Sequence, residues 1–189
     1  MQVILISAKS QNGKDAAAKL IKEELENKNK IVLTIHFGDA VKWLAKDFLG
    51  WDGDKISIDG RKILQTLGTD IMRNTFPDYW AEVVSKFIAA VHQWDYVIIP
   101  DLRFYNELAT ICNYNTDVTA IRINRFNQDG TPFYNPNMIP EQLNHISECE
   151  LDNCPFEWII ENLGTLDDLK DSIQIFVENI IEKRNLKYE

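Results

Sequence analysis

Short apolar runs alternate along this chain with longer segments of helical pattern, and this alternation limits the possible folds more than any other feature. Continuous apolar stretches of about four to eight residues are typical of strands that are covered on both faces. The segments between them carry apolar residues at helical spacing. We expect strands at 2–7, 30–37, 96–101, 118–124 and 156–162, and helices at 14–28, 39–49, 60–74, 78–93, 105–113 and 165–184.

This order of elements predicts an α/β fold of three layers, with a doubly wound, mostly parallel five-stranded sheet between helices. The 189 residues are enough for one domain with a substantial core, and no linker divides them. We therefore expect a single domain over residues 1–189. Residues 125–140 are polar and contain three prolines. Because a loop of that length in a compact domain usually has a function, we expect a lid segment over about 125–147.

Composition excludes several classes of function. The formal net charge is −9, whereas proteins that coat nucleic acid or bind a membrane surface need a basic face. The three cysteines form no C-x-x-C pair, so neither a disulfide framework nor a zinc site is indicated. The first residues lack the pattern of a signal peptide, and no apolar run reaches membrane-spanning length. We expect a cytoplasmic protein without nucleic-acid or membrane partners.

Residues 8–15 read A-K-S-Q-N-G-K-D between an expected strand and an expected helix. That is the setting of the phosphate-binding pattern G-x-x-x-x-G-K-[ST], whose backbone N–H groups and helix N-terminus bind anions. Gly13 would permit close approach of a phosphate, and Lys14 would reach its outer oxygens. Ala8 replaces the first glycine, which is tolerable where φ is negative. Asp15 replaces the hydroxyl residue and offers Mg²⁺ a hard oxygen ligand instead. An ordinary strand–turn–helix corner stays open as the alternative.

A polar stripe follows on the helix expected at 60–74. Arg61, Gln65, Thr69 and Arg73 recur every four residues, so they lie along one side of that helix. Two arginines and an amide in this arrangement have the groups needed to bind a phosphate and a polar base edge. A solvated helix face, which explains most such stripes, is the alternative.

The strand expected at 96–101 ends in a carboxylate. Asp101 would therefore lie at the carboxyl edge of the sheet, where ligands bind in folds of this kind. Arg103 follows two residues later, within reach of a phosphoryl group in transfer. A salt bridge that closes the strand end is the alternative.

Two arginines flank the entry to the expected lid. Arg125 would fold over bound phosphates and stabilise charge that develops during transfer, whereas we expect Arg122 to be a surface cation. Trp80, next to Tyr79, is either a wall for a stacked base or a core aromatic. The three histidines show neither metal nor triad spacing, and we assign them no chemistry.

Taken together, these segments resemble the phage-type deoxynucleoside monophosphate kinases of the P-loop kinase superfamily. The matching stretches run from residue 3 to about 170: SQNGKDAAA, FGDAVKWLA, GRKILQTLGTDIMR, PDYWAEVV, IIPDLRFYNELA and HISECELDN with FEWIIENLGTLDDL. A loop ending in Lys-Asp is itself a pattern of this family, whereas Ala8 departs from its usual glycine. Animal-type phosphomevalonate kinases look related as well, and share the Gly-Lys-Asp loop and segments similar to SECELDN and WIIENLG.

The resemblance implies ATP-dependent phosphorylation of deoxynucleoside 5′-monophosphates to diphosphates, with Mg²⁺, in the cytoplasm of a host if the chain is virus-encoded. It also leaves room for a homodimer. Two alternatives stay open: a phosphomevalonate-type kinase, and a nucleotide-binding protein without turnover. The accepted bases and the choice between ribose and deoxyribose are not predicted. The implied catalytic residues are Lys14, Asp101, Arg103 and Arg125; the ATP contacts Ser10, Asn12, Gly13, Lys14, Asp15, Ala16 and Asn162; the substrate contacts Lys42, Arg61, Gln65, Thr69, Arg73, Trp80, Arg103 and Glu148; and the metal ligands Asp15 and Asp101.

Overall fold

A computed structural model describes residues 1–53, 63–64, 66–91 and 93–187. Its centre is a five-stranded sheet in the order β2-β3-β1-β4-β5, and all four neighbouring pairs are parallel. This confirms the predicted α/β class and the strand count. The strands are β1 (Gln2–Ala8), β2 (Val32–Thr34), β3 (Tyr96–Leu102), β4 (Val118–Arg125) and β5 (Trp158–Asn162).

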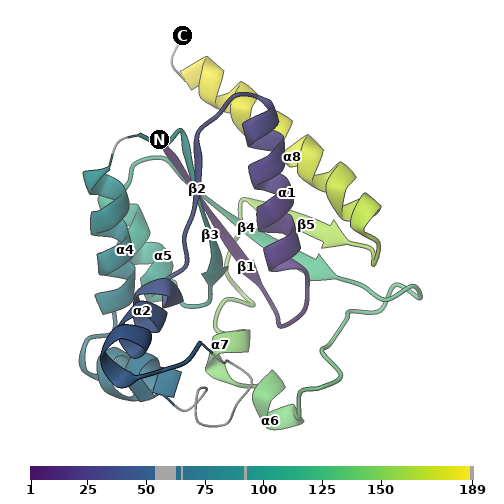
Figure 1. The fold of residues 1–189 in the computed structure, drawn as a ribbon. Helices are drawn as coiled ribbons and strands as arrows, with labels where there is room; N and C mark the ends of the chain where they lie inside the picture. The colour runs from purple at the N-terminus through teal and green to yellow at the C-terminus, as the bar shows by residue number, and fades with distance from the viewer. Residues whose placement is uncertain (54–62, 65, 92, 188–189) are drawn as a thin grey trace.

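Helices cover both faces of the sheet, as Figure 1 shows. They are α1 (Lys14–Asn27), α2 (Gly38–Leu49), η1 (Thr66–Arg73), α4 (Tyr79–Ala90), α5 (Tyr105–Tyr114), α6 (Pro140–Leu143), α7 (Ile146–Cys149) and α8 (Leu166–Lys187). Thr165 caps α8, because its Oγ1 accepts the N–H of Asp168 at 3.1 Å. Within the described ranges, no helix combines the length and apolar character needed to cross a membrane.

The central strand β1 belongs to two hydrophobic cores. Ile4 and Ile6 face α1 and α8, while Val3 and Leu5 face α4 and α5. Successive side chains of a strand point to opposite faces, so a strand covered on both sides is apolar at every position. This explains why every residue of β1 is buried and why its sequence is one continuous apolar run.

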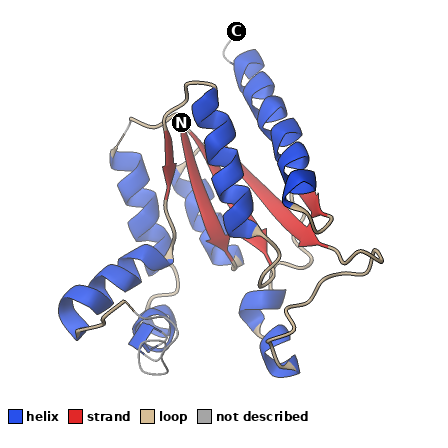
Figure 2. Cartoon of the chain, turned by 45° about the vertical axis from the view of Figure 1, so that its right-hand side comes forward, coloured by secondary structure: helices blue, strands red, loops and turns tan. Residues whose placement is uncertain are grey.

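The connections place a crevice at one end of the sheet. The neighbours β1 and β3 are followed by helices on opposite faces, α1 in one core and α5 in the other. In open α/β sheets, ligands bind where the connections diverge in this way, beyond the carboxyl ends of the strands. Figure 2 shows the strand arrows pointing toward the end where α2, α6 and α7 gather.

Four elements differ from expectation. The predicted strand 30–37 is only Val32–Thr34, because the His36 N–H binds Asp39 Oδ2 at 2.8 Å and leads the chain into α2. In place of the α-helix expected at 60–74, the described residues form η1, a π-helix, and 54–62 and 65 lie outside the described residues. The short helices α6 and α7 were not predicted.

Candidate active site

The loop between β1 and α1 has the backbone of an anion cradle. Gln11 and Gly13 adopt positive φ angles of 60° and 98°, which turns the chain sharply before α1 begins at Lys14. The first intrahelical bond runs from Ala17 N to Gly13 O at 2.8 Å. The N–H groups of the preceding turn therefore have no carbonyl partner in the helix, and they point out of its N-terminus.

Two buried asparagines brace this loop. The Oδ1 atom of Asn12 accepts the backbone N–H of Arg125 at 2.8 Å, and Asn162 Nδ2 donates to the carbonyl of Asn12 at 3.2 Å. A Cβ atom at Gly13 would lie 2.7 Å from Asn162 Nδ2, so only glycine fits there. Both asparagines were predicted to contact ATP, and in the structure their side chains hold the shape of the loop.

Lys14 and Asp15 form an ion pair on the open side of the loop. Their Nζ and Oδ1 atoms are 2.6 Å apart, and the Asp15 side chain is 72% exposed. The next residue, Ala16, packs against the core. The loop thus presents one ammonium and one carboxylate beside the N-terminus of α1.

A cavity of about 330 Å³, here called the inner cavity, opens at the carboxyl edge of the sheet, where Asp101 lies near the end of β3. Its walls come from α2, η1, α4 and the chain that follows β3. The structure brings five of the predicted residues together on it: Lys42, Arg73, Trp80, Asp101 and Arg103.

Arg73 is fixed in the inner cavity by a buried carboxylate. Its Nη2 atom lies 2.7 Å from Glu107 Oε1, and its guanidinium carbon lies 4.1 Å from the centre of the Phe104 ring. Glu107 also accepts the N–H of Arg103 at 2.8 Å. Burial raises the pKa of Glu107 above its ordinary value, while Arg73 and the Arg103 N–H act in the opposite direction. The sequence analysis missed Glu107.

Asp101 holds the start of α2 against the cavity. Its two carboxylate oxygens accept the N–H groups of Phe37 and Gly38, at 3.1 and 3.3 Å. Farther along α2, Lys42 Nζ donates to Asp39 Oδ1 at 2.6 Å. Burial opposes ionisation of Asp39, but the hydrogen bonds from Lys42 and from the His36 N–H outweigh it and lower its pKa.

Trp80 is both a buried aromatic and part of the cavity wall. It is almost completely buried, and its indole Nε1 donates to the carbonyl of Gly68 in η1 at 3.1 Å. Tyr79 is partly exposed and meets the Trp80 ring edge to face. The structure confirms that Trp80 is a core aromatic, and a base stacked on it stays a prediction.

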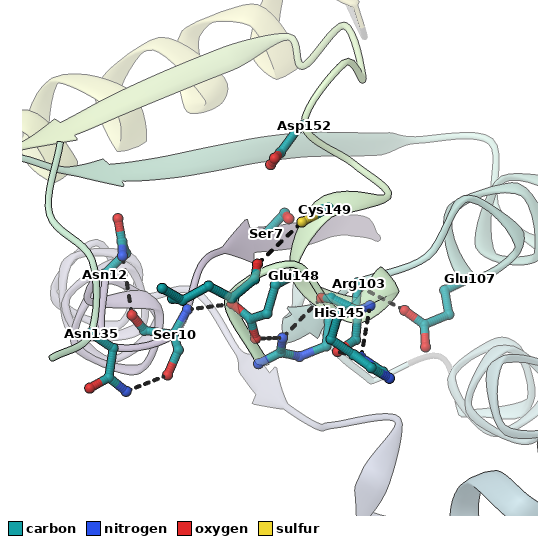
Figure 3. Close-up of polar contacts among 12 residues, drawn as sticks. Ser7, Ser10, Asn12, Arg103, Glu107, Asn135, His145, Glu148, Cys149 and Asp152 are labelled. Atoms are coloured by element: carbon teal, nitrogen blue, oxygen red, sulfur yellow. Dashed lines mark hydrogen bonds and ion pairs between the residues drawn. The ribbon is translucent and has the colours of Figure 1, made fainter. Parts of the chain in front are cut away.

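A second cavity of about 830 Å³, here called the lid cavity, lies between the loop and the segment after β4. Ser10 and Glu148 line it, and it shares Arg103, His145 and Ser147 with the inner cavity. Figure 3 shows Glu148 between Ser10 and Arg103. Arg103 thus stands at the junction of the two cavities.

The expected lid touches the phosphate-binding loop at two points. Arg125 Nη1 donates to the carbonyl of Gln11 at 3.2 Å, and its guanidinium stacks on Phe133 at 4.3 Å. Asn135, a buried residue of the lid, donates from Nδ2 to Ser10 Oγ at 3.0 Å. Arg125 therefore lies beside the loop, as a lid arginine requires.

The interpretation of Arg122 as a surface cation was wrong. The residue is 7% exposed, and it binds Ser7 Oγ and Asp152 Oδ1, each at 2.8 Å. Asp152 also accepts Lys9 Nζ from the loop at 2.7 Å. A partner 30 residues away in the sequence neutralises Arg122, and periodicity within one strand carries no sign of it.

Comparison with known proteins identifies the family. Residues 45–173 match the family of deoxynucleotide monophosphate kinases. The chain belongs to this family. It is a nucleotide kinase, and its two cavities lie at the carboxyl edge of the sheet, where ligands bind in open α/β folds.

Solved structures share the fold of this nucleotide kinase. Gluconokinase from Sinorhizobium meliloti is 12% identical with a TM-score of 0.52, over 100% of this chain and 98% of that one. The Mycobacterium tuberculosis APS kinase in complex with AMPPNP and APS is 11% identical with a TM-score of 0.50, over 94% and 97%. The comparison with curated proteins finds no match.

Three of the predicted side chains lie outside the part of the chain that the structure describes. Arg61 and Gln65 lie outside the described residues, and so does the side chain of Thr69, whose backbone belongs to η1. Other lining residues were not predicted: His145, Ser147 and Asn135. For Glu107 a signal existed, since it lies in the stretch IIPDLRFYNELA that carries part of the family resemblance.

Proposed function

We propose that this nucleotide kinase transfers the γ-phosphoryl group of ATP to the 5′-phosphate of a deoxynucleoside monophosphate. The observation that carries the proposal is the junction of the two cavities at Arg103. The lid cavity adjoins the phosphate-binding loop, and the inner cavity carries Arg73 and Lys42 beside an aromatic wall. A donor phosphate and an acceptor phosphate can therefore approach one arginine from two sides.

The reaction needs positioning and charge more than it needs proton transfer. The bond between the γ-phosphorus and the bridging oxygen of ATP breaks, a bond from that phosphorus to an acceptor phosphate oxygen forms, and ADP leaves. The acceptor phosphate is already an anion at neutral pH, so no general base is required. Lys14 and the loop N–H groups bind the donor, Arg73 and Lys42 hold the acceptor, and Arg103 stabilises charge on the transferring group.

The residues present fit a magnesium ion that is carried by the nucleotide. Mg²⁺ in kinase sites keeps several waters and binds one or two carboxylates together with substrate phosphates. Asp15 supplies an exposed carboxylate beside the loop, and the described residues contain no cluster of three acidic or thiol ligands that would hold the ion without a nucleotide. The ion would neutralise charge on the phosphates.

The inner cavity also fits the proposed acceptor class. Val41, Phe104 and Trp80 give it apolar and aromatic walls, against which a nucleobase can stack. Arg73 is held from behind by Glu107 and keeps its planar fork for a phosphate. The arrangement therefore separates a surface for the base from cations for the phosphate.

The test is an ATP-consumption screen across the common deoxynucleoside and ribonucleoside monophosphates and phosphomevalonate, with product analysis. We expect a deoxynucleoside diphosphate and ADP in equal amounts. Lys14→Ala should abolish turnover and keep the melting temperature, because among the described residues the Lys14 side chain pairs only with exposed Asp15. Lys19→Ala, an exposed position of the same helix, is the matched control. Phosphomevalonate as the only acceptor, or a folded Lys14→Ala enzyme of normal activity, would refute the proposal.

A further inference from the structure

Glu148 connects the phosphate-binding loop with the arginine at the junction of the cavities. Its side chain is only 8% exposed. One oxygen, Oε2, accepts the backbone N–H of Ser10 at 2.8 Å, and the other, Oε1, pairs with Nη1 of Arg103. Figure 3 shows this bridge from the loop to the arginine. A single buried carboxylate therefore sets the position of the guanidinium relative to the loop.

The bridge leaves part of the guanidinium available. The side-chain hydrogen bonds of Arg103 with described residues run through Nη1, which also donates to the carbonyl of Ser147 at 3.0 Å. Because a guanidinium carries five N–H donors in a rigid plane, fixing it through one nitrogen orients the other two. Those donors are free to face a phosphoryl group that passes between the cavities.

The same carboxylate places a negative charge against the loop. Ser10 belongs to the anion-binding turn, and the N–H of Ser10 is occupied by Glu148. A carboxylate so close to bound phosphates repels them, so it weakens nucleotide binding in the ground state. This loss of ATP affinity in the ground state is offset when the same carboxylate orients Arg103 better in the transition state.

We infer that Glu148 is a positioning residue: it aligns Arg103 for phosphoryl transfer and, by its charge, loosens the binding of ATP. This inference rests on the proposed function for its kinetic part. It gives Glu148 a different role from the substrate contact that the sequence suggested, because both carboxylate oxygens are already engaged by protein groups.

The test compares Glu148→Gln with Glu150→Gln. Glu150 lies in the same segment and accepts a backbone N–H from Tyr105 at 2.8 Å, but it reaches neither the loop nor Arg103, so it is the matched control. In Glu148→Gln the amide oxygen can still accept from Ser10, while its NH₂ group faces the guanidinium and misaligns it. We expect kcat to fall about tenfold or more while ATP binds about threefold to tenfold more tightly, a combination that simple loss of structure does not give.

A double-variant cycle links the effect to Arg103. If Glu148 acts through that arginine, Glu148→Gln should cost much less kcat in an Arg103→Lys background than in the wild type. If the fold losses in kcat of the two single variants multiplied in full in the double variant, the inference would be overturned. A Glu148→Gln enzyme with the kcat of Glu150→Gln would overturn it as well.

Calorimetric titration with ATP separates this inference from the proposed function, because binding of the donor requires no acceptor. If the wild type phosphorylated none of the monophosphates, the proposed function would fail. Tighter ATP binding by Glu148→Gln, and not by Glu150→Gln, would still support the charge effect of Glu148 at the loop. Equal ATP affinities of the two variants would overturn the inference in either case.

Discussion

Asp15 and Asp101 were both predicted as metal ligands, and the structure gives them different surroundings. The two oxygens of Asp101 each accept a backbone N–H at the start of α2, so this carboxylate already has a structural task. Asp15 is largely exposed, and its one ion pair within the described part of the chain is with its neighbour Lys14. Of the two, Asp15 has the freer oxygens for a hydrated cation.

Replacement of Asp15 by Asn should therefore change the magnesium requirement. The amide keeps the size of the side chain but removes the charge that a hard divalent cation prefers. We expect the magnesium concentration for half-maximal rate to rise several-fold, and excess metal to restore part of the activity.

A purely electrostatic role of Asp15 at the helix N-terminus predicts a different result. In that case Asp15→Asn would lower the melting temperature without moving the magnesium midpoint. Glu23→Gln, on an exposed turn of the same helix, shows the effect of losing a carboxylate remote from the loop. Magnesium titrations and melting curves of both variants decide between the two roles.

Arg73 allows a second prediction at the scale of one residue. Arg73→Lys keeps the charge but loses the planar fork, the stacking on Phe104 and the geometry of the pair with Glu107. We expect KM for the deoxynucleotide to rise about tenfold, since one good charge-assisted contact is lost, and KM for ATP to stay within about twofold.

The matched control for Arg73 is Arg184→Lys. Arg184 also stacks on an aromatic ring, that of Tyr96, but it belongs to α8 and lines neither of the two cavities. Its replacement should leave both KM values unchanged. Equal rises in both KM values for Arg73→Lys would show that the residue supports the fold instead of the acceptor.

At the scale of elements, the sequence predicted those whose pattern is local. The apolar run at 96–101 became β3, and the spacing in 165–184 became α8, because periodicity and capping are written in neighbouring residues. The helices α6 and α7 have four residues each, too few to show a period. Their segment is held by long-range contacts, such as that of Glu148 with Ser10, 138 positions away.

In the candidate site too, local features of the sequence could be predicted and contacts between distant elements could not. The strand-end position of Asp101 and the loop at Gly13 could be predicted, because each follows a recognisable strand. The partners of Arg73 and Arg122 could not be predicted. Glu107 holds Arg73 from a different helix, and Asp152 neutralises Arg122 from beyond the lid, so both depend on how distant elements pack.

The contact between α4 and η1 gives a prediction for an element. Trp80→Phe keeps an aromatic wall but removes the indole N–H that binds the carbonyl of Gly68. We expect η1 to move relative to the inner cavity, KM for the acceptor to rise several-fold and KM for ATP to stay constant. The free energy of unfolding should fall by about 1–2 kcal/mol, because a buried carbonyl loses its partner.

Trp94→Phe provides the comparison for Trp80→Phe. Trp94 packs beside the second core and contacts Phe87, but it lines neither cavity. Trp94→Phe should lower the free energy of unfolding without changing KM for the acceptor or KM for ATP. A rise in acceptor KM that is equal in the two variants would mean that the bond to Gly68 does not position η1.

At the scale of the whole molecule, the two cores are separated by the sheet and the site lies at its edge. The core of α1 and α8 contains Ile21, Phe176 and Val177, and none of these lines either cavity. The other core contains Leu151 and Phe37, which belong to segments that reach the site. Stability can therefore be changed through α8 without touching the cavities, whereas the second core is coupled to them.

Two neighbouring residues of α8 test this separation. Phe176 is 1% exposed and meets the Trp158 ring edge to face at 5.6 Å, whereas Ile175 is 58% exposed. Phe176→Ala should lower the free energy of unfolding by about 3–5 kcal/mol, because it leaves a cavity in a packed core. Ile175→Ala should change it by about 0.5 kcal/mol or less, as surface substitutions do. Denaturant titrations measure both values.

The decisive measurement is the activity of Phe176→Ala at a temperature where it is still fully folded. The substitution removes contacts between α8 and the sheet, whereas the groups that we propose to bind and orient phosphates come from the loop, α2, η1, the connection after β3 and the lid. We therefore expect kcat and both KM values within about twofold of the wild type, since distant sites act independently. A large fall in kcat with circular dichroism unchanged would show instead that α1, which packs on α8 and begins at Lys14, transmits strain from that core to the phosphate-binding loop.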